Sequence, residues 1–299
     1  KAHIREFTYA PQVGMTSETT PTNLRLLYGY DTMGRLASKA FSIVGMKKGI
    51  TTERYSYNES GNDNYVKTET ILDAYDNNHT TSITYYDGLN RPVETVANGL
   101  NQAGTYAVTH TAYDSRGRES EIWLPVVSGT SPDYVPYSSV GSLASSTYSD
   151  ACAYSHKSYD ILDRLLKETT PGSAWHSGGK GVTYEYLTNT ANSVMKYDAP
   201  CGKNSLVKDG YYKANTLTSV KTTDEDGHTL ESFSDFEGRK ILERRNGNND
   251  TYFVYNVLGQ LRYVLTPQYQ TDKAKDTGAY EYRYDSNGNV VKKILPGCE

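Results

Sequence analysis

The sequence is poor in the aliphatic residues that build most protein cores. Hydrophobic residues make up 36% of the 299 residues, and this share already includes 28 Tyr, against 5 Phe and 2 Trp. Tyrosine supplies an apolar ring, but its hydroxyl group needs a hydrogen-bond partner when the ring is buried. We therefore expect an interior that is partly polar.

Other absences exclude several classes of protein. The net charge is -4, the pI is near 5.9 and there is no basic run, which argues against nucleic acid as a partner. No stretch approaches the roughly 18 apolar residues of a membrane-spanning helix, which argues against membrane insertion. Cys152, Cys201 and Cys298 are too few and too far apart for a disulfide framework or a close-spaced zinc site. The chain starts at Lys1 without an initiator Met or a signal peptide, so we expect a piece of a longer polypeptide.

One short pattern recurs along most of the chain: Tyr-Asp, two free residues, Gly, and then usually Arg, Gln or Asn. Its clearest copies are Tyr30-Asp31-Thr-Met-Gly34-Arg35, Tyr113-Asp114-Ser-Arg-Gly117-Arg118, Tyr255-Asn256-Val-Leu-Gly259-Gln260 and Tyr284-Asp285-Ser-Asn-Gly288-Asn289. Weaker copies are Tyr57-Asn58-Glu-Ser-Gly61-Asn62, Tyr75-Asp76-Asn-Asn-His79, Tyr86-Asp87-Gly-Leu-Asn90-Arg91, Tyr159-Asp160-Ile-Leu-Asp163-Arg164 and Ser234-Asp235-Phe-Glu-Gly238-Arg239.

This pattern predicts a β-hairpin turn. Asp or Asn at the first turn position accepts backbone N–H groups of the turn, and Gly at the fourth supplies a left-handed residue. The Gly position is otherwise filled by Asn90, Asp163 and His79, which are residue types that tolerate a positive φ. We therefore expect Val at Gly117 or Gly288 to destabilise the fold, and Asn at the same positions to be mild.

The segments around these turns alternate between aromatic and polar residues, as in Tyr280-Glu-Tyr282-Arg-Tyr284, which is typical of strands. The predicted fold class is all-β: antiparallel sheets of irregular repeated hairpins, forming an elongated or curved ribbon or a partial shell. Helix is expected only at about 138–147, where Ser and Ala gather. Residues 125–181 carry four Pro and many Ser and predict long loops around the Tyr159 turn, and residues 268–278 predict a polar connection.

The Tyr-Asp-x-x-Gly-Arg copies resemble the YD repeat of the Rhs family, which are large secreted or cell-surface polypeptides of bacteria. Longer strings at 85–93, 117–125 and 252–265 are also similar to Rhs-type proteins. The resemblance implies a spiralling ribbon of hairpins that wraps into a hollow shell in full-length relatives, many of which end in a C-terminal toxin or effector. On this basis we divide the chain into N-terminal YD-type hairpins at 1–82, an Rhs-type β module at 83–267 with its loop insertion around 125–181, and a connection plus a further hairpin at 268–299.

No common catalytic motif is present, and the six His are scattered singly. We therefore predict no enzymatic activity, no cofactor and no metal. The segment Asp224-Glu-Asp226-Gly227-His228 resembles a truncated calcium loop but lacks the full ligand spacing, so a tight hairpin is favoured.

Aromatic residues leave a second interpretation open, because sugars stack on Trp and Tyr. The candidate ligand-binding residues are Trp123, Trp175, Tyr184 and Tyr186, although a row of Tyr at every second position is more often one face of a packed sheet.

The leading hypothesis is a non-catalytic scaffold segment of a large exported Rhs/YD-repeat polypeptide, located outside the cell or on its surface. Its partner would be the remainder of that polypeptide, including a C-terminal effector. The alternatives are a surface module that binds glycans or proteins and, less favoured, a carbohydrate-active enzyme with two facing carboxylates.

Overall fold

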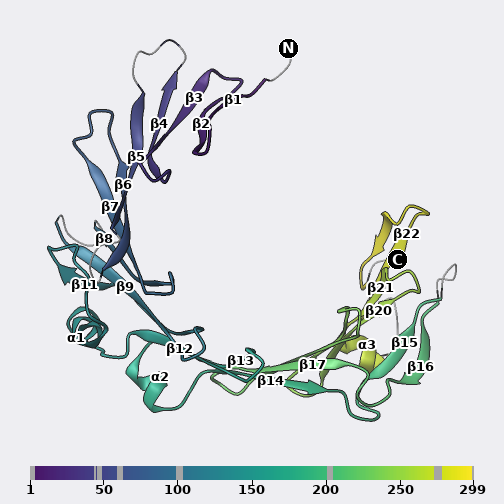
Figure 1. The fold of residues 1–299 in the computed structure, drawn as a ribbon. Coiled ribbons are helices and arrows are strands. Elements are labelled where there is room, and N and C mark those ends of the chain that lie inside the picture. Colours follow the sequence, from purple (N-terminus) through teal and green to yellow (C-terminus); the bar gives the residue numbers. More distant parts are fainter. Residues whose placement is uncertain are drawn as a thin grey trace. The chain divides into compact units, whose positions relative to one another are not determined.

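The computed structural model describes residues 4–43, 45, 49–58, 63–98, 104–200, 205–272 and 278–297. These residues form 23 strands and three helices (Figure 1), and every strand pairing found among them is antiparallel. The predicted all-β hairpin fold is therefore confirmed. The chain divides into two compact units, Lys1–His156 with Thr170–Gly178 and Lys157–Thr169 with Gly179–Glu299. The three-part division made from the sequence stays a prediction.

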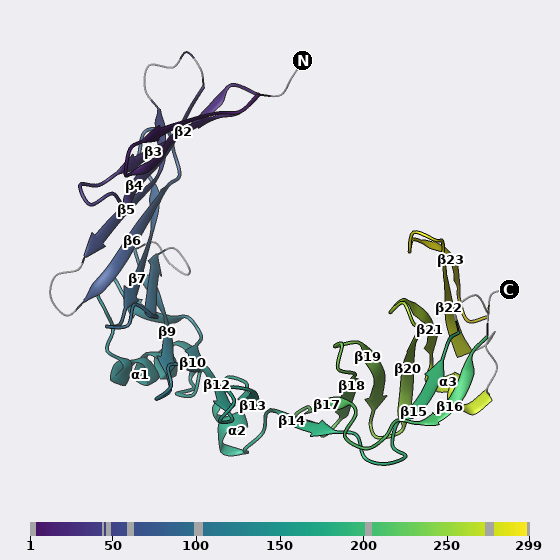
Figure 2. The same cartoon turned by 45° about the vertical axis from the view of Figure 1, so that its right-hand side comes forward.

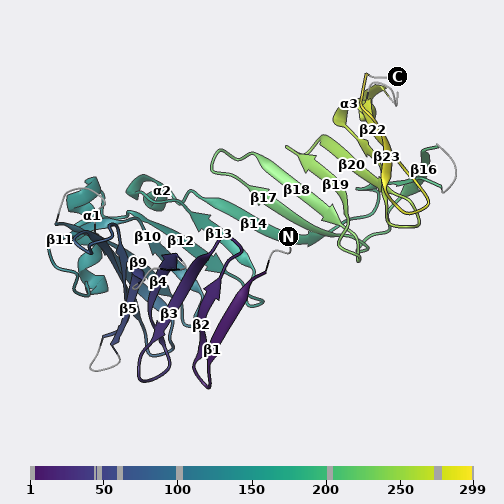
Figure 3. The same ribbon diagram turned by 90° about the horizontal axis from the view of Figure 1, so that it is seen from above.

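The first unit is a sheet in which each strand from β1 to β9 pairs with the next along the chain, and Figure 3 shows the first five of these strands in succession. At the end of this succession β9 pairs with both β10 and β11, and β10 pairs with the start of β12. Its elements are β1 (Glu6–Ala10), β2 (Gly14–Thr19), β3 (Leu24–Tyr30), β4 (Leu36–Ile43), β5 (Ile50–Asn58), β6 (Asn64–Ile71), β7 (His79–Tyr86), β8 (Pro92–Asn98), β9 (Tyr106–Tyr113), β10 (Glu119–Trp123), β11 (Val126–Gly129), α1 (Tyr137–Tyr148), β12 (Tyr154–Tyr159, shared with the second unit) and α2 (Ser173–Ser177).

Strands β1 to β6 form a single layer. Ser17 and Ser42 are the buried residues among these six strands, and most of the other side chains are half-buried. When both faces of a sheet contact water, aliphatic side chains gain little from burial. Tyr, Thr and Ser are favoured there because their hydroxyl groups can stay hydrated. The single layer thus accounts for the shortage of aliphatic residues in the sequence.

The hydrophobic core of the first unit lies where a second layer covers the sheet. Helix α1 lies beside β9 and β11 (Figure 1), and its buried Val140 and Ala144 pack with Ile83, Val96 and Val108 of the strands. Alternate residues of β7 and β8 point into this core, as period-two strands require.

The second unit repeats this arrangement. Its main sheet joins β13, β14 and β17 to β23 in order, and a separate hairpin, β15–β16, lies near α3 (Figure 2). The elements are β13 (Leu165–Thr169), β14 (Val182–Thr188), β15 (Met195–Asp198), β16 (Val207–Tyr211), β17 (Thr218–Thr223), β18 (Thr229–Ser234), β19 (Lys240–Arg245), β20 (Asn249–Tyr255), β21 (Leu261–Leu265), α3 (Pro267–Asp272), β22 (Ala279–Tyr284) and β23 (Val290–Ile294).

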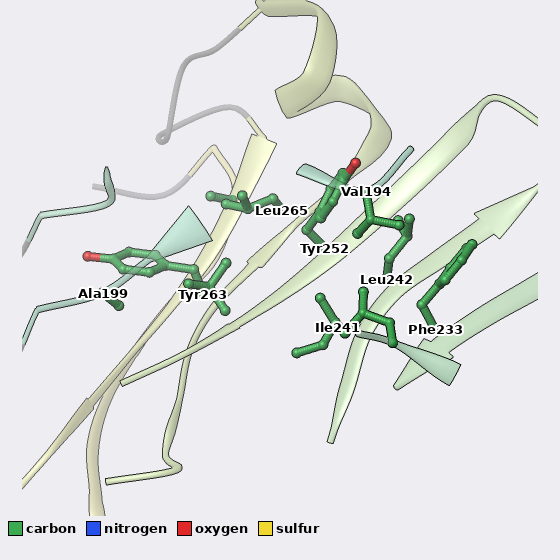
Figure 4. Close-up of a cluster of buried hydrophobic side chains, with 11 residues drawn as sticks. Val194, Ala199, Phe233, Ile241, Leu242, Tyr252, Tyr263 and Leu265 are labelled. Atoms are coloured by element: carbon green, nitrogen blue, oxygen red, sulfur yellow. The ribbon is translucent and has the colours of Figure 1, made fainter. Parts of the chain in front are cut away.

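The core of the second unit lies between this hairpin and the sheet. Figure 4 shows Val194, from the segment leading into β15, beside Leu242 of β19 and Tyr252 of β20. The Tyr252 hydroxyl also accepts a hydrogen bond from the backbone N–H of Met195 at 3.4 Å. The hairpin therefore covers one part of a sheet that would otherwise be a single layer.

Residues 125–181 differ from the sequence prediction of long loops. They contain β11, α1, β12, β13 and α2, and the turn at Tyr159 joins β12 to β13. The expected helix at 138–147 is confirmed as α1, which extends one residue further at each end. The connection at 268–278 also begins as helix α3, while residues 273–277 lie outside the described part.

Within the described residues, no helix has both the length and the hydropathy required to span a lipid bilayer.

The candidate functional site is a chain of linked turns

The repeated turn is organised by the side chain of its first residue. In the first clear copy, Asp31 Oδ1 accepts the backbone N–H groups of Met33 at 2.9 Å and Arg35 at 2.8 Å. Asp31 Oδ2 accepts Nε–H of Arg35 at 2.8 Å. The backbone closes the same loop, because the N–H of Asp31 donates to the carbonyl of Arg35 at 2.8 Å. The Asp31 carboxylate thus fixes both the turn backbone and the guanidinium group of Arg35, the fifth residue of the turn.

The same hydrogen bonds recur at the other copies, with the donor at the fifth position free to vary. The first and fifth residues of these turns are Asp87 with Arg91, Asp114 with Arg118, Asp160 with Arg164, Asp235 with Arg239, Asn256 with Gln260 and Asp285 with Asn289.

The fourth position of the turn is left-handed, as the pattern predicts. Its φ is between 75° and 84° at Gly34, Gly117, Gly238, Gly259 and Gly288, and it is 60° at Asn90 and 64° at Asp163. This position therefore selects for backbone conformation.

The pKa values of the turn carboxylates follow from these contacts. The hydrogen bond from the Arg118 side chain, followed by its backbone N–H, lowers the pKa of Asp114 to about 2. The backbone N–H of Arg35 is the main cause that holds the pKa of Asp31 below its ordinary value. These carboxylates are held as anions for the turn, which makes them poor general acids.

A tyrosine from a following strand links several of these turns to a neighbouring hairpin. The ring of Tyr57 on β5 lies under the guanidinium group of Arg35, 4.3 Å from its central carbon, and the Tyr57 hydroxyl donates to the carbonyl of Leu36 at 2.8 Å. Leu36 directly follows the turn residue Arg35, so one tyrosine holds both the side chain and the backbone at the exit of the preceding turn.

This tyrosine clamp recurs along the chain. Arg91 lies over Tyr113 at 4.3 Å and Arg164 over Tyr186 at 4.2 Å, while the hydroxyls of Tyr113, Tyr186 and Tyr284 donate to the carbonyls of Pro92, Leu165 and Leu261. In three of the clamps the tyrosine follows its acceptor by 21 residues. The spacing is present in the sequence, but it joins residues of different hairpins, so the pattern within one hairpin does not predict the clamp.

One turn differs from its sequence assignment, and a second is only partly described. At Tyr75-Asp76-Asn-Asn-His79, the prediction that His79 fills the left-handed position is wrong: the turn begins at Asp73, Asp76 has a φ of 62°, and His79 starts β7. The Asp73 carboxylate accepts the backbone N–H groups of Tyr75 and Asn77, as the first residue of the other turns does. The turn therefore begins three residues before Asp76, where the sequence pattern placed its start. The end of the copy at Tyr57 falls on residues 59–62, which lie outside the described part.

The acidic segment at Asp224 is a further copy of the turn that lacks the preceding tyrosine. The Asp224 carboxylate accepts backbone N–H groups of Asp226 and His228, Gly227 has a φ of 85°, and the turn joins β17 to β18. Among the residues that the structure describes, no group of three or more His, Cys, Asp or Glu side chains is placed to hold a metal ion.

The four candidate ligand-binding residues do not belong to one unit. In the first unit Trp123 is buried, with its ring 4.5 Å from that of Tyr154, and Trp175 on α2 is 37% exposed. Tyr184 and Tyr186 lie on β14 in the second unit, and Tyr186 is part of a clamp. A ligand-binding role for these residues stays a prediction.

A family model described as Domain of unknown function (DUF6443) matches residues 58–188, which include β6 to β14 with α1 and α2. No curated protein matches the chain. Among solved structures, similarity is found to the complex TcdB2-TccC3, with 14% identity, a TM-score of 0.58 and coverage of 97% of this chain and 16% of that one. On this basis the fold is assigned as similar to that of the matched part of this complex.

Two further structures of the same complex agree with this assignment. TcdB2-TccC3 without its hypervariable C-terminal region has 13% identity and a TM-score of 0.61, over 97% of this chain and 19% of that one. TcdB2-TccC3-Cdc42 has 13% identity and a TM-score of 0.54, over 98% and 19%. The chain thus spans less than a fifth of the solved chains that it matches, and the similarity is one of fold.

Proposed function

We propose that this chain is a wall segment of a larger Rhs/YD-repeat polypeptide, which is exported and encloses a space with a shell of hairpins. The observation that carries the proposal is the tyrosine clamp, because at four turns it links the turn to a following hairpin without needing a second layer of structure. A single-layer sheet held in this way can extend over a large area with few aliphatic residues. The remainder of the parent polypeptide, with a C-terminal effector, would be its partner.

The proposal includes no catalytic role. The turn carboxylates are each committed to backbone N–H groups and to a fifth-position donor, so they are not free to act as a pair on a glycosidic bond. The solved structures resemble this chain in fold, and a scaffold role depends on the fold.

Maleimide labelling of single cysteines in the full-length parent polypeptide tests whether one face of the sheet is enclosed. Lys292 and Lys293 are exposed neighbours on β23 that pair in regular register with Arg283 and Tyr282, so their side chains point to opposite faces of the sheet. In a parent whose Cys152, Cys201 and Cys298 are replaced by Ala, we expect a bulky maleimide to label one of Lys292→Cys and Lys293→Cys and to spare the other. Both should react in guanidinium chloride. Equal labelling of the two in the native parent would contradict an enclosing wall.

A glycan-binding role is the second candidate, and the partial exposure of Trp175 is the observation that favours it. A glycan array with the native chain and Trp175→Ala tests this role. Saturable binding that the substitution abolishes would support it. Trp123→Ala is unsuitable for this purpose, because Trp123 is part of the core under α1.

A further inference from the structure

Two titratable side chains are buried in the first unit, away from the turns. Glu94 on β8 is 2% exposed and His110 on β9 is 4% exposed. They are register partners on adjacent strands, so their side chains leave the same face of the sheet. Glu94 Oε2 and both ring nitrogens of His110 have no hydrogen-bond partner among the described residues. Buried polar groups are usually satisfied, so this pair calls for a physical explanation.

The pair lies in a polar row that crosses several strands. Register places Tyr65 opposite Tyr85, Tyr85 opposite Glu94, and Glu94 opposite His110. The whole row lies within residues 58–188, which the family model matches.

An arm formed by residues 130–148, which include α1, covers this row. The backbone N–H of Val135 donates to Glu94 Oε1 at 2.9 Å, and the Tyr85 hydroxyl donates to the carbonyl of Pro132 at 3.0 Å. The ring of Tyr137 packs on His110 with 5.2 Å between centroids. Opening the arm would therefore expose both titratable groups to water.

We propose that Glu94 and His110 exchange one proton when the arm closes. In the open state the exposed pair is a carboxylate and an imidazolium; in the closed state the proton has moved from the His110 ring nitrogen to the Glu94 carboxylate, which leaves a neutral acid and a neutral imidazole. No proton is taken up or released overall. The transfer makes both side chains neutral when they are buried in the low-dielectric core, which avoids the cost of burying two ions.

The direction of each pKa shift agrees with this exchange. Burial raises the pKa of Glu94 from 4.5 to about 7, with the Val135 N–H opposing the rise and Asp63 adding to it. Burial lowers the pKa of His110 from 6.5, with Glu121 opposing the fall. Tyr85 and Tyr134 also face Glu94, and Tyr137 faces His110.

Each group alone would make arm closure depend on pH, but with opposite sign. The raised pKa of Glu94 favours closure at low pH, and this contribution is lost as the pH rises from 4.5 to about 7. The lowered pKa of His110 favours closure above pH 6.5, and this contribution is lost as the pH falls below that value. In the proposed closed state both groups are neutral, so between about pH 4.5 and 6.5 the two effects oppose each other. The arm of the native protein then stays closed over an acidic range in which either group alone would change its stability.

Hydrogen exchange of the Val135 amide tests the proposal, since this N–H is bonded to Glu94 in the closed arm. Between pH 4.8 and 6.3 we expect a constant protection factor in the native chain. In Glu94→Gln, which keeps an acceptor for Val135, protection should fall by up to tenfold per pH unit as the pH is lowered. In His110→Gln it should rise by up to tenfold per unit over the same range. Trp123 fluorescence in a Trp175→Phe background gives a second readout of arm opening.

His176→Gln is the matched control. Its ring is in the same unit and contacts Tyr154, but its Nε2 already has the Tyr154 carbonyl as a partner at 2.9 Å, so this variant should keep the flat profile. Opposite slopes in the two test variants support the exchange. Flat profiles in both, or a native profile with the slope of either variant, overturn it, and His110→Gln alone decides the matter if Glu94→Gln does not fold.

Discussion

Within the turns, backbone geometry accounts for the choice of residue at each position. Asp or Asn comes first because its side-chain oxygen accepts two N–H groups of the turn, as at Asp31 and Asn256. The fifth residue can be Arg, Gln or Asn because each still donates to the first side chain. The fourth residue must tolerate a positive φ, which Gly, Asn and Asp do at the lowest cost.

Substitution of Gly34 tests the left-handed position without a steric complication. A Cβ at Gly34 meets no atom within 4 Å, whereas at Gly117 it would lie 2.8 Å from Arg91 Nη1. We expect Gly34→Val to lower the free energy of unfolding by about 1–3 kcal/mol, because a β-branched residue is strained at a φ of 79°. Gly34→Asn, the control, should cost less than half as much. Equal losses of melting temperature in the two variants would refute the turn assignment.

The lowered pKa of Asp114 predicts how the stability of its turn depends on pH. Its pKa is lowered from 3.8 to about 2, so its contribution to stability is complete above about pH 4 and is lost as the pH falls through about 2. Asp114→Asn should therefore be less stable than the native chain at pH 6, and the difference should shrink towards pH 2. Carboxyl NMR titration measures the shift directly, and a midpoint near 3.8 would show that Arg118 does not stabilise the anion.

Between elements, the tyrosine clamp supplies contacts that a second layer would otherwise provide. In the single-layer part of the first unit, Tyr57 joins β5 to the turn between β3 and β4. An arginine over an aromatic face contributes about 0.5–1 kcal/mol at an exposed site, and a hydroxyl-to-carbonyl hydrogen bond about 1 kcal/mol. Several such clamps in series are comparable with the stability of a small domain.

A double-mutant cycle measures one clamp. Arg91 and Tyr113 form the clamp between the turn at Asp87 and β9. We expect a coupling free energy of about 0.5–1 kcal/mol between Arg91→Met and Tyr113→Leu, because each change removes the same stacking contact. Tyr113→Phe alone should cost about 1 kcal/mol through the lost hydrogen bond. The control cycle pairs Arg91 with Tyr186, which belongs to the clamp of Arg164, and should show no coupling; equal coupling in both cycles would reject the clamp.

The local turn chemistry could be predicted from sequence, but the contacts between hairpins could not. Asn90 and Asp163 in the Gly position indicated a positive φ because only backbone conformation explains those substitutions. By contrast, the link from Tyr57 to Leu36 depends on the pairing of β4 with β5, which no local pattern specifies. The buried pair of Glu94 and His110 cannot be predicted for the same reason, because the two residues are neighbours only through strand register.

At the scale of the whole molecule, burial is concentrated in two local cores. One lies under α1 in the first unit and the other under the β15–β16 hairpin in the second, and each consists of residues from its own unit. Stability in such a chain is approximately a sum of local terms, as in repeat proteins whose elements contact mainly their sequence neighbours. We therefore expect that one unit can unfold without unfolding the other.

Calorimetry of core variants tests this division. Leu242 is fully buried in the second core, and Ile83 is 5% exposed in the first. We expect two thermal transitions in the native chain. Leu242→Ala should lower one of them and Ile83→Ala the other, each by about 2–5 kcal/mol in the free energy of unfolding, because a cavity adds to the lost burial. Each variant is the control for the other, since both remove a buried aliphatic side chain. A single transition that both variants shift equally would mean that the sheet transmits stability between its two units, and the wall would then have to be understood as one cooperative structure.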